Sequence, residues 1–110
     1  MDSKRQAQIS KLIQRVLGIY FQRNGTALFQ AFITVTQASI SKDLQFCKVY
    51  ISIFLSKDKN KTLDLIKEHK KQFRNEIAKE CSQLRVVPEV QFILDDSLDY
   101  VEHIEDLLKQ

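Results

Sequence analysis

The stretch LRVVPEVQFIL, from Leu84 to Leu94, decides the fold because it predicts a β-strand that follows a long helical segment. It is rich in β-branched residues, and its two faces alternate as Val90, Phe92 and Leu94 against Glu89, Gln91 and Ile93. It also contains Pro88, the one proline in 110 residues. Because proline has no amide hydrogen, a strand with a proline is expected at the edge of a sheet, or with the proline near its start.

Two further strands are predicted upstream, FITVTQASIS (Phe32 to Ser41) and LQFCKVYISIFL (Leu44 to Leu55). The short polar link Ser41-Lys42-Asp43 predicts an antiparallel hairpin. One face of the second strand is aliphatic, with Cys47, Val49, Ile51, Ile53 and Leu55. We expect helices to cover that face, since alternate residues of a strand point to opposite sides of a sheet.

Helical periodicity predicts the remaining elements. Ser3 and Gln6 have capping-box spacing, and Asn24-Gly25 predicts the end of the first helix. Its apolar stripe consists of Ile9, Leu12, Ile13, Val16, Leu17 and Tyr20. After polar residues 57–60, one long helix or two shorter ones are predicted by Leu63, Ile66, Phe73, Ile77, Cys81 and Leu84. A final helix, Leu98 to Lys109, follows the capping side chains of Asp95-Asp96-Ser97.

The order of elements predicts an α+β fold in a single domain, residues 1–110, with a three-stranded sheet. The second strand, the helical segment and the third strand form a βαβ unit, so the third strand should run parallel to the second through a right-handed crossover. The first strand occupies the other side of the second. The third strand is therefore expected at an edge of the sheet, which accounts for Pro88.

Composition excludes several classes of protein. No apolar run reaches the ~18 residues that a membrane span needs, and the polar N-terminus MDSKRQAQISKL lacks a secretory apolar segment, so a cytoplasmic protein is expected. Cys47 and Cys81 are expected to be small buried hydrophobes. His69 and His103 are expected to be solvated helix residues. We expect no metal, no cofactor and no catalysis, because no cluster with ligand spacing and no nucleophile with a nearby base is visible.

The net charge of +3 is unevenly distributed. Residues 58–85 have eight basic and five acidic side chains, whereas residues 86–110 have one basic and seven acidic. The first 25 residues are also basic, with five basic side chains and one acidic. Such asymmetry suggests a polyanionic partner for one side of the molecule.

The sequence resembles the ribosome-binding factor A family in three segments. LRVVPEVQFILDDSL (Leu84 to Leu98) is similar to the family signature L-R-x-x-P-E-L-x-F-x-x-D-x-S-L, with Val90 in place of the usual leucine. SKDLQFCKVYISIF (Ser41 to Phe54) is similar to S-x-D-L-x-x-A-K-V-Y-V-S, with Cys47 in place of a small residue. The weakest of the three is the helical pattern around residues 13–21.

The resemblance implies a KH-like domain of type II that is not an enzyme. It implies binding to the small (30S) ribosomal subunit and its 16S rRNA late in assembly, help with processing of the 5′ end of that RNA, and importance in the cold. KH domains that clamp RNA use a Gly-x-x-Gly loop, but this chain has only Gly18 and Gly25. The family has a kinked helix pair around an alanine instead, and the nearest candidates are Ala78 and Cys81, with Lys79 near the place of a common glycine.

The resemblance makes the basic side chains of the helical segment candidates for rRNA contact, with those of the first helix as a second group. They are Lys67, Lys70, Lys71, Arg74, Lys79 and Arg85, then Lys4, Arg5, Lys11 and Arg15. Each could also belong to a solvated face, and Arg85 could pair with Glu89. The aromatic residues Phe46, Tyr50 and Phe54 could stack on bases, although local packing is the simpler interpretation.

Two other classes of function remain open. A protein-interaction module could dock a basic partner through the acidic segment from Asp95 to Asp106. A small-molecule-binding domain is less well supported, because no glycine-rich phosphate loop is visible. We expect no small-molecule substrate, and a monomer when the protein is free.

Overall fold

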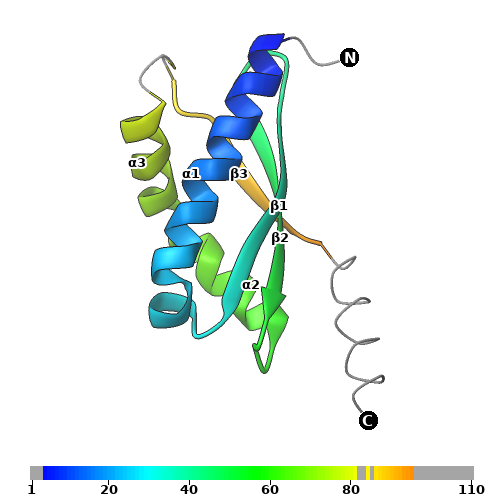
Figure 1. Ribbon diagram of the computed structural model, residues 1–110, viewed down its shortest axis with the longest axis vertical. Coiled ribbons are helices and arrows are strands. Elements are labelled where there is room, and N and C mark those ends of the chain that lie inside the picture. Colours follow the sequence, from blue (N-terminus) through cyan, green and yellow to red (C-terminus); the bar gives the residue numbers. More distant parts are fainter. Residues whose placement is uncertain (1–3, 82–83, 85, 96–110) are drawn as a thin grey trace.

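The computed structural model describes residues 4–81, 84 and 86–95. The elements in chain order are α1 (Lys4–Phe29), β1 (Phe32–Ile40), β2 (Phe46–Phe54), α2 (Lys59–Glu68), α3 (Lys70–Glu80) and β3 (Glu89–Leu94). Figure 1 shows α1 and α3 side by side over the sheet. The predicted α+β fold with a three-stranded sheet is confirmed. The Ser3 cap and the final helix at residues 98–109 lie outside the described residues.

The sheet has the order β1-β2-β3, with β1 antiparallel and β3 parallel to the central strand β2. The predicted edge position of β3 is therefore confirmed. Pro88 is buried and lies one residue before the strand, while the amide of Glu89 donates the first bond, to the carbonyl of Gln45 at 2.8 Å. Because the β2–β3 ladder begins after Pro88, the missing amide hydrogen costs the sheet no bond.

The core lies between the helices and the predicted aliphatic face of β2. Cys47, Val49, Ile51 and Ile53 are fully buried there, whereas Leu55 lies beyond the strand and is exposed. The helices and β3 add an aromatic cluster, in which Phe92 of β3 packs with Tyr20, Phe21, Phe29 and Phe73 of the helices. The sequence pattern missed Phe21, which is buried, and counted Tyr20, which is half-buried and donates its hydroxyl to Gln72 Oε1 at 2.7 Å.

The predicted end of α1 at Asn24-Gly25 is wrong, because the helix continues to Phe29. The chain leaves the helix at Gln30, which has a φ of 54° and donates its amide to the carbonyl of Thr26. Gly25 is buried in the helix, and a Cβ placed on it would lie 3.2 Å from the carbonyl oxygen of Ala31. Close approach of the returning backbone therefore explains this glycine, rather than a role in ending the helix.

The two helical glycines predict opposite outcomes on replacement. Gly18→Ala should stabilise the fold by about 0.5–1 kcal/mol, because alanine restricts the unfolded chain and favours the helix and no atom lies within 4 Å of the added Cβ. Gly25→Ala should not give this gain, because its Cβ presses on the backbone of Ala31. Urea unfolding of both variants measures the difference; equal stabilisation of the two would contradict the packing account.

The crossover consists of two helices that meet at His69, which was one of the two alternatives in the sequence. His69 has φ −89° and ψ 20°, outside the helical range, and it ends α2 and precedes α3. The suggested kink at Ala78 or Cys81 is wrong, since α3 runs unbroken through Ala78 and Cys81 follows its end. His69 is also not simply solvated: its Nδ1 donates to the carbonyl of Leu65 at 2.9 Å, and its ring contacts Phe29 edge-on.

Asp95, directly after β3, forms hydrogen bonds to both other strands of the sheet. Its amide donates to the carbonyl of Ile51 at 2.7 Å, and its carboxylate Oδ2 accepts from the hydroxyl of Thr36 at 2.7 Å. Thr36 occupies the irregularity in the β1–β2 register between Val35 and Gln37. This side chain of the acidic segment is therefore engaged within the fold, while residues 96–106 of that segment lie outside the described residues.

Candidate nucleic-acid interface

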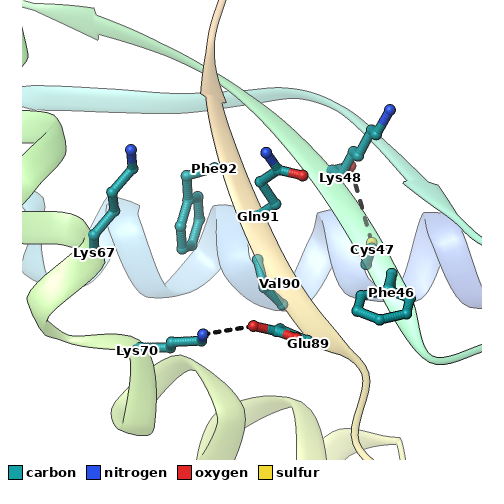
Figure 2. Close-up of a pocket in the computed structure, with 9 residues that line it drawn as sticks. All are labelled: Phe46, Cys47, Lys48, Lys67, Lys70, Glu89, Val90, Gln91 and Phe92. Atoms are coloured by element: carbon teal, nitrogen blue, oxygen red, sulfur yellow. Dashed lines mark hydrogen bonds and ion pairs between the residues drawn. The ribbon is translucent and has the colours of Figure 1, made fainter.

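A groove separates β3 from the junction of α2 and α3. It consists of two adjoining hollows, of about 580 and 940 Å³, which share Phe46, Lys70, Glu89, Val90 and Phe92. Figure 2 shows the first hollow, with Lys67 and Lys70 on the helical side, β3 in the middle, and Phe46 and Lys48 on β2. We call the two hollows together the crossover groove. The fold thus opens a surface between the two parts of the βαβ unit.

Four of the predicted basic residues gather at this groove. Lys67 and Lys70 line the first hollow, and Lys70, Lys71 and Arg74 line the second. Lys67 lies in the last turn of α2, and Lys70, Lys71 and Arg74 lie in the first half of α3; all four are exposed. Lys70 and Lys71 also open α3, whose first turn has no acidic residue. Their charges add to the positive end of the helix dipole, so this part of the groove favours anions.

Lys48 is a lining residue that sequence reasoning missed. Its place in the alternation of β2 predicted only that it lies on the polar face of the sheet. The parallel register pairs Lys48 with Gln91 on β3, which brings the lysine beside the groove. The partner strand and register of Lys48 could not be read from the spacing within β2, so no local pattern pointed to this residue.

The other predicted residues lie elsewhere. Lys79 does not line the groove and has its Nζ 3.7 Å from Glu76 Oε1. Arg85 lies outside the described residues. The second group, on α1, is exposed but does not line the groove: Lys4, Arg5, Lys11 and Arg15. Arg15 instead lines a separate hollow between α1 and α3 together with Glu76 and Glu80, so its surroundings are of mixed charge.

Two acidic side chains, Glu68 and Glu89, line the groove beside five basic ones. Glu89 Oε1 lies 2.8 Å from Lys70 Nζ, and each side chain is 56% exposed. The hydrogen bond and the charge of Lys70, with a smaller contribution from Arg74, hold the pKa of Glu89 below its usual value. The carboxylate is therefore ionised at neutral pH and partly offsets the positive charge of the rim.

The floor of the groove is largely apolar. Val90 and Phe92 contribute from β3, and Phe46, 54% exposed, lies at the side. Tyr50 and Phe54 are half-buried and do not line the groove. The amide of Glu89 donates to Gln45, just before β2, and the amide of Asp95 donates to Ile51 of β2. By the alternation of a parallel ladder, the amides of Val90 and Phe92 therefore point away from β2, toward the open edge. Such an edge offers hydrogen-bonding groups next to an apolar surface.

The cysteines do not supply reactive groups. Both are free and buried, as expected from the sequence. Burial raises the pKa of Cys47 to about 11, so its thiol stays protonated at neutral pH. Burial also raises the pKa of Cys81. Over residues 4–81, 84 and 86–95, no cluster of metal-ligating side chains occurs, and no helix has the length and hydrophobicity to cross a bilayer.

Comparisons with known proteins agree on one family. The family profile described as Ribosome-binding factor A matches residues 5–108. The Ribosome-binding factor A of Cytophaga hutchinsonii is 38% identical over 112 residues, which cover 100% of this chain and 84% of that protein. The factor from Chloroflexus aggregans is 34% identical over 111 residues, which cover 100% of this chain and 87% of that protein. These matches confirm the resemblance seen in the sequence segments.

Solved structures show the same fold. The crystal structure of ribosome-binding factor A from Thermus thermophilus has a TM-score of 0.68 at 19% identity, covering 81% of this chain and 94% of that one. A homology model of the Thermus thermophilus factor, fitted into a cryo-EM map of a 30S–RbfA complex, has a TM-score of 0.63 at 21% identity. That likeness covers 87% of this chain and 97% of the other.

Proposed function

This chain belongs to the ribosome-binding factor A family, and from that membership we propose that it binds the small (30S) ribosomal subunit as an assembly factor. It acts late in maturation of the subunit and assists processing of the 5′ end of 16S rRNA. It does so by binding RNA, without catalysis and without a cofactor. The protein works in the cytoplasm and is a monomer before it binds.

The basic rim of the crossover groove is the observation that supports this proposal most directly. Lys67, Lys70, Lys71 and Arg74 come from two helices and, with Lys48 of β2, surround one groove. Lysine and arginine contacts to phosphates position a protein on RNA without reading its sequence. An assembly factor that recognises a folded ribosomal surface needs contacts of this kind, and exposed side chains can supply them.

The junction at His69 supports contact through side chains rather than through a backbone clamp. A KH clamp needs glycines, so that the chain can approach the RNA backbone closely. Here the junction contains Glu68, His69 and Lys70, and the ring of His69 packs on Phe29 inside the fold. This arrangement supports phosphate contacts made by the side chains of the flanking lysines and Arg74.

Co-sedimentation tests the proposed function. The purified protein is mixed with isolated small subunits, large subunits or whole ribosomes over a series of salt concentrations. We expect selective pelleting with free small subunits, and an affinity that falls steeply as salt rises, because phosphate contacts release counterions. Protein that stays in the supernatant with small subunits at low salt, or that pellets equally with large subunits, would contradict the proposal.

A further inference from the structure

Glu89 places a negative charge at the basic rim of the crossover groove. Its amide donates to the carbonyl of Gln45, the residue before β2, and the buried Pro88 precedes it. Its carboxylate oxygen Oε1 lies 2.8 Å from Lys70 Nζ, and the charge of Arg74 also lowers the pKa of this carboxyl group. The lysine that lines both hollows is thus already paired within the fold.

A phosphate that binds Lys70 must displace this carboxylate or lie close beside it. The exchange is inexpensive, because ion pairs between exposed side chains contribute little to stability. Without exchange, the ligand would face the repulsion of a fixed negative charge. With exchange, the displaced carboxylate attracts a cation in place of Lys70, which offsets the cation that the RNA phosphate releases when it binds Lys70. The position of Glu89 therefore affects both the affinity for a polyanion and its dependence on salt.

We propose that Glu89 is an internal competitor, which occupies Lys70 in the free protein and is displaced by an RNA phosphate when the groove is filled. The inference rests on the proposed function for the identity of the ligand. The competitor lowers the affinity of the groove for polyanions in general. Only a ligand that makes further contacts with the rim and floor compensates for the loss of the internal pair, so Glu89 favours the correct RNA surface over other nucleic acid.

The test compares Glu89→Gln with Asp64→Asn, which makes the same change in net charge at a position of α2 that does not line the groove. On a heparin column, Glu89→Gln should elute at higher salt than both Asp64→Asn and the parent protein. With isolated small subunits at low salt, it should bind about threefold more tightly, with a log–log salt dependence steeper by about one phosphate contact. In a Lys70→Ala background, the change at Glu89 should no longer steepen that dependence.

The outcomes separate this inference from the proposed function. Elution of Glu89→Gln and Asp64→Asn at the same salt concentration would contradict the proposed competition by Glu89. Weaker binding of Glu89→Gln to small subunits, with its thermal unfolding unchanged, would contradict it as well. If the parent protein fails to bind small subunits but Glu89→Gln still elutes later from heparin, the proposed function fails and the competitor stands. If binding to small subunits is selective but unaffected by Glu89→Gln, the function stands and the competitor fails.

Discussion

Lys71→Glu/Arg74→Glu should reduce the affinity for small ribosomal subunits on the order of 100-fold at about 0.1 M salt, because each phosphate contact contributes close to a factor of ten under these conditions. Both side chains are exposed on α3 and line the larger hollow of the crossover groove. The salt dependence should become shallower by about two contacts. Lys70 is left unchanged, because Lys70→Glu would place a second carboxylate directly beside that of Glu89.

The matched control is Lys57→Glu/Lys61→Glu, which changes the net charge by the same amount. These lysines are exposed before and within the first turn of α2, and neither lines the groove. Acidic residues at a helix start are compatible with the helix dipole, so the control should fold normally. An equal loss of binding in both variants would show that overall charge, rather than the groove, determines the affinity.

Phe73→Ala should lower the free energy of unfolding by about 3–5 kcal/mol, a large part of the ~5–15 kcal/mol typical of a small domain. Phe73 is 1% exposed, and its ring contacts Tyr20, Phe21, Phe29 and Phe92. Its removal leaves a cavity where α1, α3 and β3 meet. Urea unfolding followed by circular dichroism measures the loss.

Phe32→Ala is the control for the same chemical change. Phe32 is 59% exposed at the start of β1, so its loss should cost well under 1 kcal/mol. If Phe73→Ala does not fold, Phe73→Leu serves in its place, because leucine keeps most of the buried volume. It should fold, with a decrease in the free energy of unfolding between those of Phe32→Ala and Phe73→Ala. Similar losses for Phe32→Ala and Phe73→Ala would contradict the central place of the cluster.

The sheet could be predicted from the sequence because period-two patterns and one proline restrict it strongly. The parallel pairing of β2 with β3 followed from the order of elements, and Pro88 required an edge or a strand start. The end of α1 could not be read in the same way. Asn24-Gly25 is a common helix end, but here the glycine serves the close approach of Ala31, a tertiary contact that local sequence does not show.

The sequence also predicted only part of the candidate interface, because some of its residues come together through tertiary contacts that the local sequence does not show. Lys67, Lys70, Lys71 and Arg74 were candidates because the resemblance pointed to the basic residues of the helical segment, and the two helices bring these four to one groove. Lys48 depends on the register between two strands that are far apart in the chain, and Glu89 depends on the position of Lys70 across the groove. Neither relation has a local signal. The break at His69 lacks both glycine and proline, so the usual markers of a helix end were absent as well.

The parallel pairing of β2 with β3 also sets the order in which the new chain can complete its sheet. β2 ends at Phe54, but its partner does not begin until Glu89, after both crossover helices. At a synthesis rate of ~5–20 residues per second, β3 follows by about 2–7 s. During that interval the hairpin has an unpaired edge on β2, next to the aliphatic residues of the future core. Translation that stops before Glu89 would leave this edge open permanently, so truncated products of that length are the ones most prone to aggregate.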